Sequence, residues 1–184
     1  MMPEDLIDFL FSKDQITSVL VQYCRAADRR DLDSLKSVYW PDAIDDHQLF
    51  KGNAHLFCEM NVATAAEICV LTQHTITNVD CRIDGDRAYV ESYIQAYHRV
   101  VGEQKALKIL MGDAYAEAHA NSGHATHDCL TGGQYFDHFE RRGGVWKIID
   151  RVARRDWSIG QPSSLTSDDA LKNTLTSFGG GLNS

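Results

Sequence analysis

The pattern of apolar and polar positions changes its period once along the chain, near residue 72. Before that point apolar residues recur every three to four positions, as on the buried face of a helix. After it they alternate with polar residues, as in a strand. Helices that precede an antiparallel meander indicate an α+β fold. We expect a curved antiparallel or mixed sheet that wraps around a long N-terminal helix and forms a cone-shaped pocket.

The first helix is expected to follow a short apolar arm at residues 1–11. Ser12 is placed to cap it, because Gln15, three residues later, is the second member of a capping box. The helix ends at residues 29–31. Its apolar positions repeat at helical spacing and predict a buried face made of Ile16, Val19, Leu20, Tyr23 and Ala27.

Two more helices are expected before the sheet. A short one covers residues 31–40 and stops at Pro41, because the residue before a proline disfavours the helical conformation. A turn and a short strand or loop then cover residues 42–52. Asn53 caps a third helix over about residues 54–71.

The second half of the chain predicts a meander of strands. Strands over residues 73–83 and 87–101 flank a hairpin turn signal at residues 84–86. The longer strand has a small, mainly apolar face that suits a cavity wall, made of Ala88, Val90, Ser92, Ile94, Ala96, His98 and Val100. Its other face suits a subunit contact or partial exposure and consists of Tyr89, Glu91, Tyr93, Gln95, Tyr97 and Arg99.

Residues 102–131 follow no single period. Their middle part, residues 105–120, has helix-forming composition, and the whole segment suits a long hairpin or an inserted lid. Two more strands joined by a tight glycine turn complete the predicted sheet, at residues 132–142 and 145–157.

The chain is expected to form one domain over residues 1–160. After Pro162 the composition becomes rich in Ser, Thr, Gly and Asp, which predicts a weakly ordered tail over residues 161–184. Within this tail, residues 168–175 have the composition for one helical turn.

Composition excludes several classes of function. Of 184 residues, 43% are hydrophobic and 24% are charged, which is typical of a globular domain with a sizeable core. The net charge of −8 argues against nucleic-acid binding, which needs clustered Lys and Arg. No apolar run reaches the roughly 18 residues of a membrane span, and the acidic N-terminus lacks a signal-peptide pattern. Five cysteines without a CxxC pair predict reduced thiols in a cytoplasmic protein.

The first candidate for chemistry is Asp28, at the end of the first helix, with His74 on the first strand. A carboxylate beside an imidazole fixes the ring tautomer and stabilises the imidazolium, so that the histidine can act as a general base. Two plainer interpretations stay open. Asp28 could form a salt bridge with Arg25 or Arg29, and His74 could be a core histidine with its hydrogen bonds satisfied. Alternation along the strand places Asn78 on the same face as His74.

Two further residues stand out by position. His98 is the only ionisable residue on the small apolar face of its strand, and a buried imidazole there needs a hydrogen-bonding partner. Arg151, in the middle of the last strand, could bind an anionic group or developing negative charge, or could lie on a solvated face with Lys147.

Metal binding is the main chemical alternative. Candidate ligands gather at His119, His124 and His127 with Asp128, and again at Asp45, Asp46 and His47. Neither group has a recognised ligand spacing, and the sequence has no HExxH, CxxC, GxSxG, P-loop or GxGxxG motif. We therefore predict no metal and no cofactor.

Several short motifs, taken in order, resemble the SnoaL-like group of the nuclear-transport-factor-like, cystatin-like cone superfamily. The resemblance covers roughly residues 10–157 and implies the cone fold. It does not specify one reaction, because the fold hosts many functions. The motifs are Tyr23 with Asp28, Trp40 to Ala43 with Asp46 and His47, His74 with Asn78, Gly133 with Tyr135, and Glu140 to Lys147 with Arg151.

The resemblance assigns roles to these residues. In scytalone dehydratase, bile-acid dehydratase and lindane dehydrochlorinase, an aspartate of the first helix and a strand histidine form a dyad, at the positions of Asp28 and His74. Tyr23, Arg151 and His98 match or lie near further acid, base or pocket positions. The expected substrate contacts are His47, Asn78, Ile94, Ala96 and Tyr135.

The sequence therefore predicts a cofactor-independent lyase, of dehydratase or dehydrohalogenase type, or an isomerase that acts on a small hydrophobic, cyclic molecule. Two alternatives stay open: a non-catalytic ligand-binding protein on the same fold, and the small subunit of a ring-hydroxylating oxygenase. The tyrosines on the outer face of the long strand, Tyr89, Tyr93 and Tyr97, predict a homo-oligomer, either a dimer or a trimer.

Overall fold

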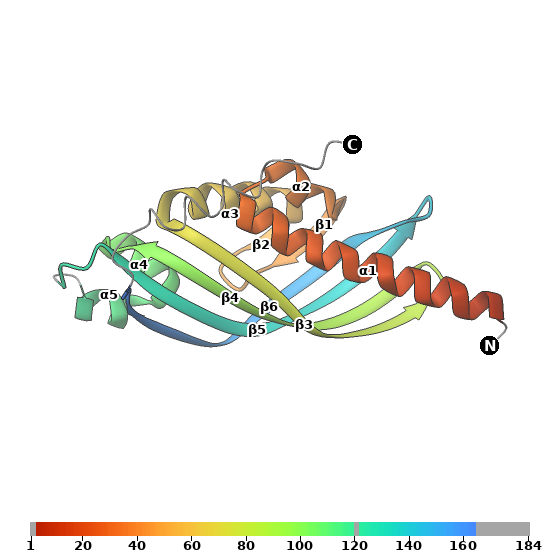
Figure 1. Ribbon diagram of the computed structural model, residues 1–184. Coiled ribbons are helices and arrows are strands. Elements are labelled where there is room, and N and C mark those ends of the chain that lie inside the picture. The colour runs from red at the N-terminus through yellow and green to blue at the C-terminus, as the bar shows by residue number, and fades with distance from the viewer. Residues whose placement is uncertain (1–2, 120–121, 165–184) are drawn as a thin grey trace, which may run out of the picture.

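The computed structural model describes residues 3–119 and 122–164. It is an α+β fold in which one curved six-stranded sheet, in the order β2-β1-β6-β5-β4-β3, is covered on its concave side by helices (Figure 1). Strands β1 and β6 pair in parallel, whereas the other neighbours are antiparallel. The expected mixed sheet and long N-terminal helix are confirmed.

The first helix, α1 (Pro3–Arg29), is longer than the pattern predicts. The apolar arm at residues 1–11 is helical from Pro3 on, so Ser12 lies within the helix and does not cap it. Ser12 is fully buried, and its hydroxyl accepts a hydrogen bond from Arg141 at 3.4 Å. The capping-box interpretation was therefore wrong, because a serine packed against another element can be accommodated inside a helix.

The second helix, α2 (Leu32–Ser37), ends before Pro41 is reached. Asp31 caps it by accepting the backbone N–H of Ser34 at 3.1 Å. Pro41 instead lies in β1 (Tyr39–Asp46), so the predicted helix over 31–40 was too long at its C-terminal end. The short strand β2 (Lys51–Asn53) leads into α3 (Ala54–Ile68), which Asn53 caps as predicted.

The hairpin of β3 (Cys69–Asp84) and β4 (Arg87–Val101) follows the sequence prediction closely. Gly85 in its turn has a φ of +58°, which glycine adopts without steric cost. On β4 the small face points towards the helices, and its buried members are Ala88, Val90, Ser92, Ile94, Ala96 and Val100. On the opposite face Tyr93 is 48% exposed. The predicted homo-oligomer stays a prediction.

The segment after β4 forms two short helices, α4 (Gln104–Met111) and α5 (Asp113–His119), at one end of the sheet (Figure 1). The last two strands are β5 (Thr126–Arg142), which begins earlier than expected, and β6 (Val145–Pro162), which ends later than expected. The predicted helical turn near 168–175 lies outside the described residues. The division into a domain at 1–160 and a tail also stays a prediction.

The main core lies between the helices and the concave face of the sheet. It combines inward residues of α1 with those of the central strands, among them Ile16, Leu20, Tyr39, Val90, Phe139, Trp146 and Ile148. All five cysteines are free thiols within this core or beside it, and all are buried. Among the described residues, no helix is long and apolar enough to cross a bilayer.

Candidate active site

A cavity of about 370 Å³ opens between the concave face of the sheet and the helices α1, α3 and α4. Its volume lies within the range of small-molecule sites. Apolar and aromatic side chains line much of its wall, including Phe57, Ile94, Ala96, Leu110 and Ala153. Polar and titratable side chains make up much of the rest of the wall, and several of them contact one another.

Asp28 and His74 meet at this cavity. The last turn of α1 packs on β3, so the Asp28 carboxylate receives two hydrogen bonds from the same residue. One comes from the backbone N–H of His74 at 3.0 Å, and the other joins His74 Nδ1 to Asp28 Oδ1 at 2.6 Å. Because Asp28 engages Nδ1, the second ring nitrogen, Nε2, is left for a partner in the cavity. Asp28 thus pairs with His74, and among the described residues it forms no ion pair with Arg25 or Arg29.

His98 lies next to His74 on the neighbouring strand. Their ring centroids are 5.4 Å apart and the planes are nearly perpendicular. Burial, with a smaller contribution from His74, lowers the pKa of His98 to about 4. Its Nδ1 is buried and has no hydrogen-bond partner among the described residues. His98 is therefore a neutral imidazole on the cavity wall with one buried nitrogen unsatisfied.

The lowered pKa of His98 predicts a pH-dependent stability. Below pH 6.5 the unfolded chain takes up a proton at this residue that the folded protein does not, so the free energy of unfolding falls as the pH drops from 6.5 towards 4. The slope approaches about 1.4 kcal/mol per pH unit within that window. Urea unfolding at several pH values should show a flatter dependence for His98→Gln, while His138→Gln, at an exposed histidine, should match the wild type. Parallel curves for His98→Gln and the wild type would contradict the assignment.

A layer of aromatic rings forms the floor next to the dyad. Tyr23 of α1 packs edge-on against Tyr135 of β5, with centroids 5.7 Å apart. The Arg151 guanidinium lies 4.3 Å from the centroid of the Tyr23 ring and 4.1 Å from that of Tyr135. Burial raises the pKa of both tyrosines above the ordinary value, so both remain neutral phenols at neutral pH.

Arg151 is fully buried and does not line the cavity. It makes a two-pronged ion pair with Asp137, in which Nε and Nη2 each donate to a carboxylate oxygen at 2.7 Å. Burial alone would lower the pKa of Arg151, but Asp137 and Tyr39 raise it well above the ordinary value. The expectation that Arg151 contacts an anionic substrate directly was therefore wrong, because a carboxylate of the protein already occupies its guanidinium.

A second carboxylate–imidazole contact lies on the other side of the aromatic layer. His47, just after β1, is bonded through Nδ1 to Asp45, and its ring stacks on Phe57 with centroids 4.1 Å apart. Asp45 is fully buried and also accepts the Tyr39 hydroxyl at 2.8 Å. His47 lines the cavity, as predicted for a substrate contact.

The structure thus brings most of the sequence-predicted residues to one cavity. The predicted residues on its wall are Tyr23, His47, His74, Ile94, Ala96, His98 and Tyr135. Asp28 lies behind His74 and does not itself line the wall, and Asn78, like Arg151, is absent from it. Asn78 is exposed, has a φ of +50°, and lies where the pairing of β3 with β4 shifts register, between Thr77 and Asp80. The strict alternation that placed Asn78 beside His74 fails at this bulge.

Several wall residues have no counterpart in the sequence prediction. Ile109 and Leu110 come from α4, within the segment whose period could not be assigned. Asn61 of α3 was not singled out either, although it lies on the helix that carries Phe57. Arg155 lines the wall from β6 and donates to the Leu110 carbonyl at 3.1 Å. For Ile109 and Leu110 the only available signal was apolar residues in a helix-forming segment, and that signal does not distinguish a cavity wall from a core.

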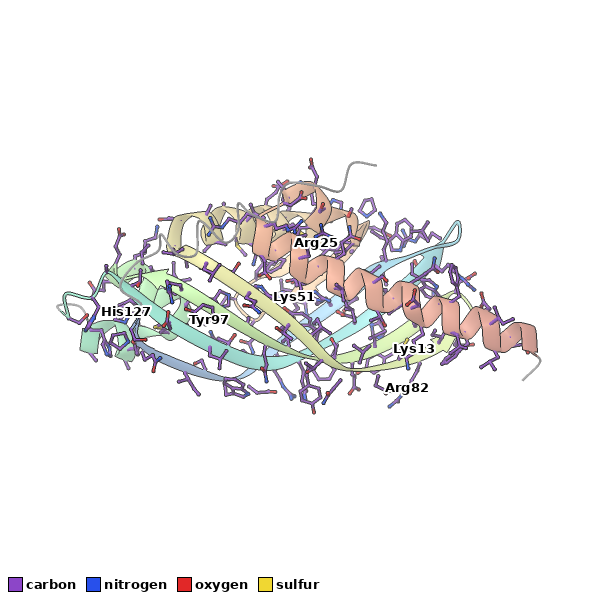
Figure 2. The ribbon with its side chains drawn as sticks, viewed as in Figure 1. Lys13, Arg25, Lys51, Arg82, Tyr97 and His127 are labelled. Carbon is purple, nitrogen blue, oxygen red and sulfur yellow. The ribbon has the colours of Figure 1, made fainter. Side chains whose placement is uncertain are left out.

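The histidine-rich segment lies away from this cavity. Figure 2 shows His127 and Tyr97 towards the end of the sheet beside α5, whereas Arg82 lies towards the opposite end. His127 bonds through Nδ1 to the Tyr115 hydroxyl at 2.9 Å, and its ring lies edge-on to His119. Across residues 3–119 and 122–164, no group of three or more His, Cys, Asp or Glu side chains is arranged to hold a metal ion.

A larger groove, of about 720 Å³, lies elsewhere on the sheet and is open to solvent. Its polar wall includes Arg82, Arg87, Tyr89, His138 and Asp150. None of the residues predicted for the site lines it, and neither carboxylate–imidazole pair reaches it. The smaller cavity is therefore the better candidate for chemistry, because paired acids and bases converge there.

Comparison with known proteins places the fold. Residues 9–152 match the SnoaL-like domain. The hexachlorocyclohexane dehydrochlorinase LinA-type3 from Novosphingobium barchaimii is 17% identical, with a TM-score of 0.67 over 86% of this chain and 95% of that one. A candidate scytalone dehydratase from Novosphingobium aromaticivorans is 18% identical, with a TM-score of 0.63 over 86% and 91%.

A protein of unknown function with a cystatin-like fold, from Nostoc punctiforme, is 13% identical, with a TM-score of 0.56 over 78% of this chain and 90% of that one. A search of curated proteins found no match. At these identities the likeness to solved structures establishes the fold alone.

Proposed function

The chain belongs to the SnoaL-like domain family, and we propose that it is a cofactor-independent lyase or isomerase in which His74 is the general base. One observation carries the proposal. His74 is held through Nδ1 by Asp28 at 2.6 Å, on the wall of a largely apolar cavity. An imidazole fixed in this way can accept a proton at Nε2 and has a carboxylate behind it to balance the charge that it gains.

The proposed reaction begins with removal of a proton from a carbon next to a carbonyl or similar activating group. The electron pair of that C–H bond then either expels a hydroxyl or halide from the adjacent carbon or returns to another position as an isomerisation. In this proposal Tyr23 and His98, both on the cavity wall, donate hydrogen bonds to the developing oxyanion. The remainder of the rate enhancement would come from positioning the substrate in a site with little water.

The cavity favours a small, mainly apolar substrate. The 370 Å³ volume and the apolar members of its wall suit a cyclic molecule with one or two oxygen substituents. The dehydrochlorinase and the candidate dehydratase among the structural neighbours carry names of elimination enzymes, which agrees with this choice. A protein that only binds a ligand would not need a carboxylate-oriented imidazole at the wall.

The proposal is tested by hydrogen exchange on simple probes. Cyclic ketones are first screened by thermal shift, and those that raise Tm are incubated with the protein in D₂O. We expect NMR to show deuterium entering the carbon next to the carbonyl faster than in buffer, because this exchange needs only the base. Binding with no catalysed exchange, for the wild type across the whole set of binders, would instead favour the non-catalytic alternative.

A further inference from the structure

The cavity contains a second imidazole that is held in the same way as the first. His74 comes from β3 and is anchored through Nδ1 by Asp28 of α1. His47 follows β1 and is anchored through Nδ1 by Asp45 of that strand. Both rings line the same cavity, and in both the carboxylate leaves Nε2 as the nitrogen that can face a bound molecule.

The two carboxylates differ in how their charge is compensated. Asp28 has a 22% exposed side chain and accepts the backbone N–H of His74, so water and a peptide group already solvate it. Asp45 is 0% exposed, and besides His47 its bonded partner is the neutral hydroxyl of Tyr39. A carboxylate without access to water is costly unless a positive charge lies beside it.

The buried charges around Asp45 do not balance without His47. Arg151 and Asp137 form a two-pronged ion pair, and Arg151 reaches towards Asp45 through the Tyr39 hydroxyl, which accepts a hydrogen bond from Arg151 Nη1 at 3.3 Å. Two carboxylates and one guanidinium leave this buried cluster one negative charge in excess. A proton on His47 removes that excess negative charge. Asp28 is partly exposed to water and accepts a backbone N–H, so it does not require a proton on His74 in the same way.

We propose that His47, positioned by Asp45, is the acid that protonates the leaving group while His74 acts as the base; this rests on the proposed function. His74 Nε2 takes the proton of the C–H bond, and that electron pair forms the new C=C bond. The C–O bond on the adjacent carbon breaks with its electron pair on oxygen, which takes the proton from His47 Nε2 and leaves as water. His47 ends neutral and His74 protonated, and exchange with solvent restores both.

The proposal predicts that variants of the two histidines respond differently to the nature of the leaving group. A hydroxyl needs a proton to depart, whereas 4-nitrophenolate leaves without one. We compare two cyclic ketones, one with a hydroxyl and the other with a 4-nitrophenoxy group on the carbon β to the carbonyl. For His47→Gln we expect elimination of water to fall by about 10²–10⁴-fold and release of 4-nitrophenolate to change by less than about tenfold. His74→Gln should lose both reactions.

Asp45→Asn should reproduce the same leaving-group selectivity, which a merely structural effect on the cavity would not. The matched control is His138→Gln, a histidine exposed on the outer side of β5, which should leave both rates unchanged. Equal losses of both reactions in His47→Gln, or no loss in either, would overturn the role of His47 and leave that of His74 standing. If the wild type eliminates neither group, the proposed function fails and the role of His47 fails with it.

Discussion

Replacing His74 by alanine is expected to abolish measurable turnover and leave the fold intact. The general base alone contributes about 10²–10⁴-fold in rate, and the alanine variant also loses the partner that Asp28 orients. The His74 side chain is 15% exposed on a cavity wall, so its removal enlarges a hollow that already exists and opens no new void in the core. The steady-state rate on a substrate found by the exchange screen measures the first effect, and Tm measures the second.

Asp28→Asn tests the orienting role separately. Asparagine can still accept the backbone N–H of His74, so the local structure should survive, but it cannot balance an imidazolium. We expect a loss of kcat/KM nearly as large as that of His74→Ala. The control is Thr75→Ala, at an exposed residue of the same strand, which should behave as the wild type. Retention of most activity by either dyad variant would show that the chemistry lies elsewhere.

Local sequence signals predicted elements well where packing and propensity agree. The hairpin at residues 84–86, the cap at Asn53 and the small inward face of β4 were all confirmed, because each depends on near neighbours in the chain. The signals failed where a distant partner decides the outcome. Ser12 looks like a cap until Arg141 is seen packed against it, more than a hundred residues away.

The candidate site shows the same division. The facing of His74 and its meeting with Asp28 agree with alternation along β3 and with the family resemblance. Asn78 departs from that alternation, because the pairing of β3 with β4 shifts register between Thr77 and Asp80. No residue in this stretch signals the shift in the sequence. The partner of Arg151 could not be predicted either, since Asp137 lies on the neighbouring strand and reads in sequence as an ordinary polar position.

The carboxylate of Asp45 is a further case. In sequence it belongs to a run of two aspartates and a histidine, which is typical of an exposed turn. The structure buries Asp45 completely, beneath His47 and Tyr39, and leaves Asp46 as the partly exposed member that pairs with Lys51. Which of two adjacent aspartates is buried depends on the pairing of β1 with β6, and that parallel pairing joins segments about a hundred residues apart.

Arg151→Met is expected to cause the largest loss of stability among these variants. The substitution leaves the buried carboxylate of Asp137 without its two hydrogen bonds, and removing one partner of a buried ion pair typically costs about 3–5 kcal/mol. Asp137→Asn should cost a similar amount, because it leaves the buried Arg151 guanidinium without its carboxylate partner. Urea unfolding followed by circular dichroism measures both free energies of unfolding.

The double variant Arg151→Met with Asp137→Leu separates a charge effect from a packing effect. Because neither charge then remains buried, we expect it to recover much of the stability lost by the single variants. Asp42→Ala is the exposed comparison: Asp42 pairs with Arg142 at 2.8 Å in contact with solvent, so its loss should leave the free energy of unfolding close to that of the wild type. If the double variant is no more stable than Arg151→Met, the guanidinium stabilises the protein through its packing on the Tyr23 and Tyr135 rings. The aromatic layer beside the cavity would then depend on this packing more than on the ion pair with Asp137.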